Sequence, residues 1–132
     1  MGTTTEVFES IDVDLRIAPA RVAEVCERLA ESEQAAAACS VAMIAEEGMA
    51  DETRLALDSI DVIQATRAVL TRASGTDKSL QTLMLEAVIA ACQRCADACG
   101  KHAQHNTHCR LHSESSQRAA DASRRALAEL RG

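Results

Sequence analysis

Apolar and polar residues along this chain are spaced like those of helices that bury one face. The clearest example runs from Arg21 to Glu47, where Pro19 fits the first turn and Gly48 fits the end. Its inward-facing positions recur in steps of three and four residues: Val22, Val25, Leu29, Ser32, Ala36, Cys39 and Met43. Such spacing is typical of a helix packed in a bundle.

Three further segments carry the same periodicity. They cover residues 51–73, a segment that starts at Asp77 or Ser79 and ends at Ala103, and residues 107–130. Ser74 to Asp77 has the composition of a turn, and Thr107 is predicted to cap the last helix. Four helices with short connections predict an all-α, antiparallel up-down-up-down four-helix bundle.

No segment has the composition of a linker, so residues 19–132 are predicted to form a single bundle domain. Residues 1–18 are predicted to form an N-terminal lead-in with a short extra helix, because Thr3 and Glu6 fit a capping box. One end of the bundle is expected to hold an apolar core built from Val22, Val25, Leu29, Val62, Val69, Leu80, Leu83, Met84, Leu127 and Leu130.

The composition narrows the classes of function. The net charge is -6, with one Phe and no Trp or Tyr, so the chain offers neither a basic face nor a stacking platform for nucleic acid. No apolar run approaches the length of a membrane span, and the N-terminus lacks the pattern of a secretory signal. We therefore expect a cytoplasmic protein with no membrane or nucleic-acid partner, whose six reduced cysteines are metal ligands or packing residues.

Cysteine and histidine gather in the segment 92–112. Spacings of three and four residues place four of them on one helix face: Cys92, Cys95, Cys99 and His102. Cys109 and His112 lie three residues apart near the start of the next helix. In an antiparallel hairpin these two sets are expected to face each other.

The up-down topology brings the end of the first long helix to the same place. The candidate metal ligands are Cys39, Met43, Cys92, Cys95, Cys99, His102, His105, His108, Cys109 and His112. Thiolates, thioethers and imidazoles favour soft or borderline ions, Cu(I) first and Zn(II) second. Arg94, Lys101 and Arg110 are expected to lower the pKa of nearby thiols. Cys26 lies toward the other end and is expected to be a packing residue.

The pattern Cys-x2-Cys-x3-Cys-x2-His from Cys92 to His102, followed by His108-Cys109-Arg110, resembles the Cys-rich four-helix-bundle copper storage proteins of bacteria. The resemblance implies a bundle whose core thiols bind Cu(I), with His and Met at the open end where metal enters. It also implies a homo-oligomer, a tetramer or a dimer, because cytosolic members of the family are homotetramers.

Several positions that carry core Cys in that family carry other residues here: Ser59, Ile63, Val88, His112, Ser116, Ala119 and Ser123. We therefore expect a cytosolic protein that holds a few Cu(I) ions at one end of the bundle, for low-capacity buffering or storage. The alternatives are a Zn(II)-binding bundle and a metal-free helical oligomer that acts as an interaction module. No nucleophile motif or Gly-rich phosphate loop is present, so no enzymatic activity is expected.

Overall fold

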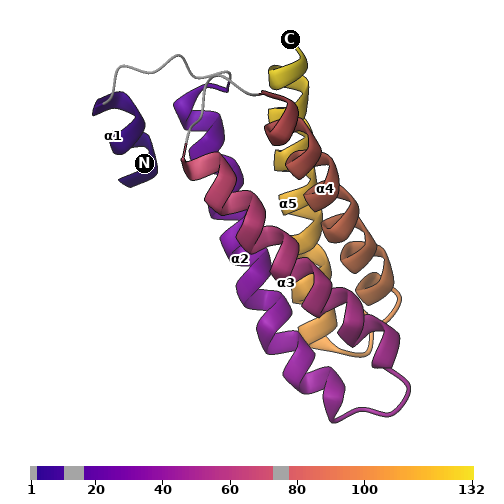
Figure 1. Cartoon of the computed structure of the whole chain (residues 1–132). Helices are drawn as coiled ribbons and strands as arrows, with labels where there is room; N and C mark the ends of the chain where they lie inside the picture. The colour runs from indigo at the N-terminus through magenta and orange to yellow at the C-terminus, as the bar shows by residue number, and fades with distance from the viewer. Residues whose placement is uncertain (1–2, 11–16, 73–77) are drawn as a thin grey trace.

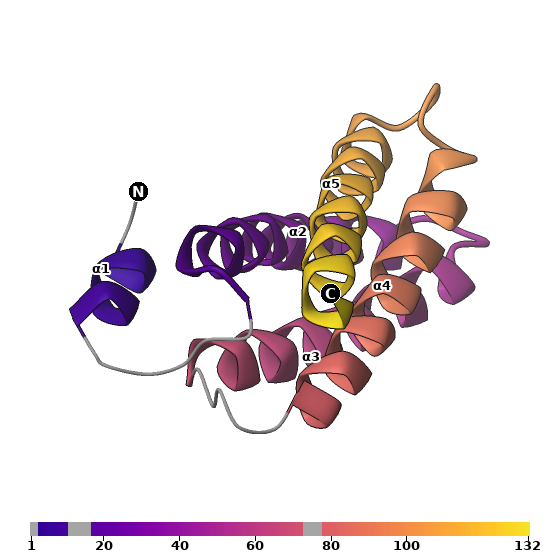
Figure 2. The ribbon, with the colours of Figure 1, turned by 90° about the horizontal axis from the view of Figure 1, so that it is seen from above.

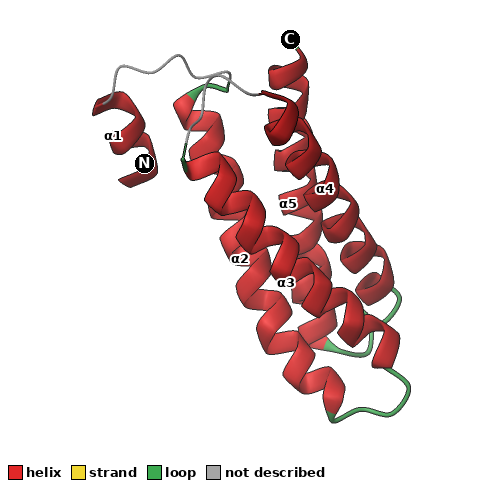
Figure 3. Cartoon of the chain, in the orientation of Figure 1, coloured by secondary structure: helices red, strands yellow, loops and turns green. Residues whose placement is uncertain are grey.

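The computed structural model describes residues 3–10, 17–72 and 78–132. These residues form helices and no strands (Figures 1 and 3). The helices are α1 (Thr3–Ser10), α2 (Pro19–Ile44), α3 (Ala50–Thr71), α4 (Lys78–Gly100) and α5 (Thr107–Arg131). The prediction of an all-α bundle of four long helices with a short N-terminal helix is confirmed. The predicted turn at 74–77 falls outside the residues that the structure describes.

The four long helices alternate in direction, and α5 closes the bundle by packing against both α2 and α4 (Figures 1 and 2). The short helix α1 lies outside this bundle, against α2. The connections 45–49 and 101–106 consequently lie together at one end of the bundle, at the bottom of Figure 1. We call this end the loop end.

Local sequence explains where the helices begin and end. Pro19 occupies the first turn of α2, where its missing N–H would have no helical partner. After α2 the chain turns at Gly48, whose φ of 81° is a left-handed conformation that side chains disfavour. The predicted cap at Thr107 is wrong by one residue: Asn106 has extended backbone angles and Thr107 is already helical. Asn106 makes no side-chain capping hydrogen bond, so the side chains give no strong signal for this boundary.

The buried stripe on α2 is confirmed at every predicted position, from Val22 through Met43. Of the predicted apolar core, Val62, Val69 and Met84 are half-buried, and the residues named from α2 and α5 are buried.

The core prediction is wrong for Leu80 and Leu83, which are 48% and 62% exposed, whereas Gln81 and Leu85 are buried. Steps of four and three residues back from Cys99 lead through Cys95, Cys92, Val88 and Leu85 to Gln81. The spacing of the cysteines therefore predicts the buried face of α4 correctly. Choosing the face by its leucines predicts the wrong one.

Leu85 and Leu111 provide a matched test of this packing. Leu85 is fully buried, so we expect Leu85→Ala to lower the free energy of unfolding by about 2–5 kcal/mol. Leu111 is 50% exposed, and Leu111→Ala should change it by less than about 0.5 kcal/mol. Urea unfolding of both reduced variants measures the difference. Equal losses would contradict the assignment of the core face of α4.

Candidate metal centre

Two overlapping groups of soft ligands lie at the loop end. Cys39, Cys99 and His112 form a fully buried group, and Cys39, His108 and Cys109 form a second group nearer the surface. Within each group the three ligand atoms all lie within 4.8 Å of one another. The Cys39 thiol belongs to both groups, so the five side chains form one continuous cluster.

The topology assembles this cluster from three helices. Cys39 lies in the last two turns of α2, and Cys99 is next to the last residue of α4. His108, Cys109 and His112 lie in the first two turns of α5. Because α2 and α4 end where α5 begins, ligands far apart in the sequence share one level of the bundle, as their spacing predicted.

Short contacts link the five side chains. His112 Nδ1 lies 3.4 Å from the Cys99 sulfur, and His108 Nδ1 lies 3.3 Å from the Cys39 sulfur. His108 Nδ1 also lies 3.5 Å from the sulfur of Cys109. His112 is fully buried, and its Nε2 has no hydrogen-bond partner in the described part of the chain.

Glu46 fixes the orientation of His108. Its Oε1 lies 2.8 Å from His108 Nε2, and a carboxylate can only accept, so Nε2 carries the proton and donates it. The other ring nitrogen then faces Cys39 and Cys109. A histidine that binds a metal through one nitrogen commonly donates from the other to a carboxylate, and this geometry fits that arrangement. Glu46 lies in the connection after α2, because the helix ends at Ile44 and the prediction of helix as far as Glu47 is wrong by three residues.

Burial disfavours ionisation of the Cys92, Cys95 and Cys109 thiols. It raises the pKa of Cys92 to about 11, and that of Cys95 and of Cys109 to about 12. The pKa of Cys39 is also raised to about 12, first by its hydrogen bond with Cys99 and then by burial. A metal that binds these groups must therefore displace protons.

The expectation that basic residues lower these pKa values is wrong. Arg94, Lys101 and Arg110 are all exposed, while the thiols point into the bundle. Charges in water are strongly screened, so desolvation of the thiolate outweighs them.

Cys92 and Cys95 lie further inside the bundle than the cluster. Cys92 packs in the apolar core with residues such as Leu29 and Leu85. The Cys95 thiol donates a hydrogen bond to the carbonyl oxygen of Leu55 at 3.3 Å. Neither cysteine joins a group of three close ligands among the described residues.

The remaining candidates occupy the rim of the loop end. Met43 is buried with Cys39, Cys99 and Cys109, and Met49, which the candidate set omitted, is buried beside them. Met43, Glu46 and Met49 also line a groove of about 310 Å³. His102 Nε2 lies 3.5 Å from Glu52 Oε1.

Two residues lie apart from the cluster. His105 is exposed in the connection 101–106. Cys26 lies near the opposite end of α2, where its sulfur is 3.8 Å from Thr71 Oγ1, as expected of a packing residue.

Three helices thus bring buried thiols and imidazoles to one end of a four-helix bundle, which defines a helical metal-binding protein with soft ligands. Among the described residues, no helix is long and apolar enough to cross a membrane. The chain belongs to the copper storage protein family (Csp), whose sequence model matches residues 17–128.

Solved structures of relatives agree with this assignment. The copper storage protein Ccsp from Streptomyces lividans, loaded with 10 copper equivalents, is 31% identical with a TM-score of 0.88, over 96% of this chain and 98% of that one. A cytosolic copper storage protein from Streptomyces lividans with five coppers is 33% identical with a TM-score of 0.77, over 82% and 92% of the two chains. No curated protein matches this chain.

The raised thiol pKa values predict a loss of stability at alkaline pH. Well below pH 9 these thiols are protonated in both states, so their contribution is fully present. Between the ordinary pKa of 9.0 and the folded values of about 11 to 12, only the unfolded state loses protons. The free energy of unfolding should then fall by up to about 1.4 kcal/mol per pH unit for each buried thiol.

Urea unfolding of the reduced, metal-free protein at pH 8, 9 and 10.5 measures this loss, and no Tyr titrates in the same range. Cys95→Ala removes one of the thiols and should reduce the slope. A free energy of unfolding that stays constant from pH 8 to 10.5 would contradict the burial of ionisable thiols.

The contact of Glu46 with His108 predicts a second effect. Glu46→Ala should free the His108 ring and weaken copper binding by about 10- to 100-fold. Glu46→Gln keeps an acceptor oxygen and should retain most of the affinity. Competition with a Cu(I) chelator measures binding, and two-bond ¹H–¹⁵N spectra report which nitrogen of His108 carries the proton. Glu47→Ala, which changes an exposed neighbour, is the control; equal affinities for Glu46→Ala and Glu47→Ala would refute the orienting role.

Proposed function

We propose that this protein holds a few Cu(I) ions at its loop end and serves as a low-capacity copper buffer or store. The observation that supports this most directly is the pair of three-ligand groups that share Cys39. Thiols scattered through the core would favour the metal-free alternative, in which cysteines only pack. Here Cys39, Cys99 and Cys109 gather around two histidines instead.

The ligands favour Cu(I) over Zn(II). Cu(I) is a soft ion that binds well to thiolates, and two or three ligands satisfy it. Each group supplies three ligands, two sulfurs and one nitrogen. Zn(II) requires four ligands in a tetrahedron, so it is the weaker candidate. The buried Nε2 of His112, which has no hydrogen-bond partner among the described residues, also supports a ring that is completed by a metal.

Access and exit of copper fit the same end of the molecule. The cluster lies beneath the groove lined by the thioethers of Met43 and Met49, which are themselves soft donors. Cu(I) that enters there meets His108 first, because His108 is half-buried and the other four members of the two groups are buried. Copper is the cargo in this proposal, and we propose no catalytic step for the protein.

The capacity for copper should be low because the interior next to the cluster is lined by serine hydroxyls. Ser32, Ser59 and Ser116 are fully buried, and the hydroxyl oxygens of Ser32 and Ser116 lie 3.3 Å apart. Hydroxyls are hard ligands that bind Cu(I) poorly. The thiols and imidazoles of the loop end, together with Cys92 and Cys95, therefore suffice for on the order of one to four Cu(I) ions per chain.

The proposed cellular setting is the cytoplasm, and the proposed assembly is a homo-oligomer. The location is supported by the relative from Streptomyces lividans that is described as cytosolic. It is also supported by the free state of all six cysteines, which a reducing compartment maintains. Exposed large apolar side chains on the outer faces of the helices support self-association.

Substituting the shared ligand tests the function. We expect Cys39→Ser to remove the tightest Cu(I) site, because the thiol belongs to both groups. Cys26→Ser is the matched control, since Cys26 is also buried but lies at the far end of α2. Anaerobic titration of the reduced proteins against a competing chelator gives stoichiometry and affinity. If Cys39→Ser binds Cu(I) like the parent protein, the proposed site is wrong.

A further inference from the structure

The two ligand groups at the loop end have the same composition and share one atom. Each group contains two cysteine sulfurs and one histidine nitrogen, and the Cys39 sulfur belongs to both. A thiolate sulfur has enough lone pairs to bridge two metal ions. Two copper ions bound in these groups are therefore neighbours joined by one sulfur, and they form a single pair.

The ligand atoms of both groups already have nearly the spacing that bound copper needs. A first-row metal ion with bonds of about 2.0 Å to nitrogen and about 2.3 Å to sulfur separates trigonal neighbours by about 3.7 Å. His108 Nδ1 lies 3.3 Å from the sulfur of Cys39 and 3.5 Å from that of Cys109. His112 Nδ1 lies 3.4 Å from the sulfur of Cys99. The helices therefore hold the nitrogen and sulfur ligands close to their metal-bound positions.

The mixture of ligands accommodates two oxidation states of copper. Thiolates favour Cu(I), whereas imidazole also suits Cu(II), and trigonal sets of His and Cys with a weakly bound Met are the ligands of electron-transfer copper sites. Met43 is 1% exposed and packs with Cys39, Cys99 and Cys109, so a thioether lies beside the cluster. A ligand set that needs little rearrangement between Cu(I) and Cu(II) permits fast exchange of an electron.

The net charge of the loaded cluster favours the loss of one electron. Three thiolates carry three negative charges, and two Cu(I) ions offset two of them, so the filled cluster is an anion. Removal of one electron makes it neutral, which burial favours, because four of its five side chains are buried. Removal of a second electron would leave a buried cation. Glu46, which lies 2.8 Å from His108 Nε2, adds a negative charge that also favours the first oxidation.

His108 gives an electron a route to the surface. Its side chain is 28% exposed, and its Nδ1 faces two of the cluster sulfurs. The ring thus connects the copper position to solvent, and the electron does not have to cross the apolar core.

We propose that the loop end holds two copper ions as one redox-active pair, bridged by the Cys39 sulfur, which gives up a single electron reversibly to a one-electron carrier. In this step one Cu(I) becomes Cu(II) and the carrier is reduced by one electron. No bond forms or breaks, and no proton moves. This inference rests on the proposed function, because copper must first bind at the loop end.

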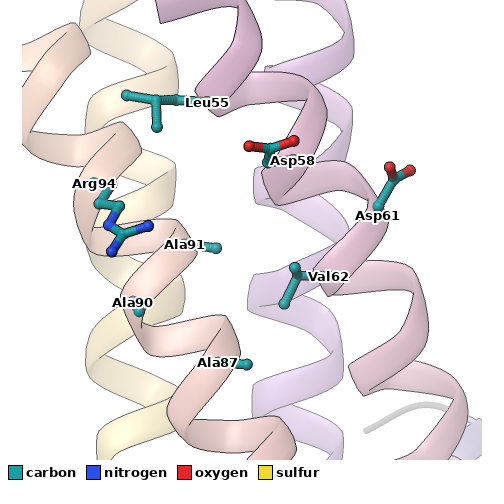
Figure 4. A pocket seen from close by; sticks show the side chains of 8 residues that line it. All are labelled: Leu55, Asp58, Asp61, Val62, Ala87, Ala90, Ala91 and Arg94. Atoms are coloured by element: carbon teal, nitrogen blue, oxygen red, sulfur yellow. The ribbon is translucent and has the colours of Figure 1, made fainter.

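A groove between α3 and α4 is the alternative place for an oxidised ion (Figure 4). Its volume is about 440 Å³, and it carries the carboxylates of Asp58 and Asp61 together with the guanidinium of Arg94. Cu(II) accepts nitrogen and oxygen ligands, but none of the residues that line this groove has a sulfur atom or an imidazole. Copper that moved there would lose the absorption that thiolate-to-Cu(II) charge transfer gives to the pair.

The experiment starts from the full-length, reduced protein loaded anaerobically with two equivalents of Cu(I). Ferricyanide is the oxidant, because it accepts single electrons and is reduced to ferrocyanide. The titration should end at one electron for every two copper ions, with visible charge-transfer absorption and a Cu(II) paramagnetic resonance signal from half of the copper. Ascorbate should abolish both signals, and the copper should stay with the protein through gel filtration.

Two cysteine variants test whether the pair is the source of the signals. Cys109→Ser breaks the group that contains His108, so it should bind one copper ion fewer and lose the reversible half-oxidation. Cys26→Ser is the matched control, because Cys26 is also buried but lies at the far end of α2, and it should behave like the parent.

Two glutamate variants test the effect of charge. Glu46→Gln removes a negative charge beside His108 and should raise the midpoint potential of the pair in a ferricyanide–ferrocyanide titration. Glu47→Gln changes an exposed neighbour, whose charge is screened by water, and should leave the potential unchanged.

Four results would overturn the redox-active pair. They are a loaded parent that transfers no electron, disulfide formation with release of copper, a Cu(II) signal without charge-transfer absorption, and reversible half-oxidation that persists in Cys109→Ser. Each of these leaves the proposed function intact, because uptake of Cu(I) is measured before ferricyanide is added. A parent protein that takes up no Cu(I) refutes the proposed function and the pair together.

Discussion

The packing of α5 against both α2 and α4 is the interaction on which the proposed metal centre depends. A single straight helix can present ligands only as a row along one face. Cys39, Cys99 and the α5 ligands form a compact group because three helices meet at one level. The apolar half of the bundle, with Leu29, Ile63 and Leu85 fully buried, holds the helices in that register. The apolar core thus positions the group of thiols and imidazoles at the loop end.

The periodicity of the sequence was sufficient to predict the helices and the end at which the ligands meet. It could not predict which ligands touch, because helical spacing gives the face of a residue and not its level against neighbouring helices. Cys92 and Cys95 share the stripe of Cys99, yet they lie deeper and outside the three-ligand groups. His105 lies in a connection, where no periodicity constrains the chain, and Glu46 lies just beyond Ile44, in a segment that was predicted as helix.

The error at Leu80 and Leu83 has a different origin. The α4 sequence contains two apolar stripes, and composition alone favoured the one richer in leucine. The buried stripe accepts Gln81 because its neighbours continue the spacing of the cysteines. The expected effect of nearby cations on the thiol pKa values failed for a physical reason. Exposed cations in water affect the pKa of a buried thiol less than the desolvation of that thiol does.

The inside of the bundle changes character along its axis. From the loop end inward, soft ligands give way to the hydroxyls of Ser32, Ser59 and Ser116, and then to the apolar layer of Leu29 and Val88. The Ser59 hydroxyl lies against the thiols of Cys92 and Cys95, at the boundary between the layer of soft ligands and the layer of hydroxyls.

Anomalous X-ray diffraction at the copper absorption edge tests this account most directly, with crystals that are loaded anaerobically with one equivalent of copper. The account predicts copper bound among Cys39, Cys99 and His112 or among Cys39, His108 and Cys109, whereas first occupancy at Cys26, or deep in the bundle with the loop end vacant, would contradict it.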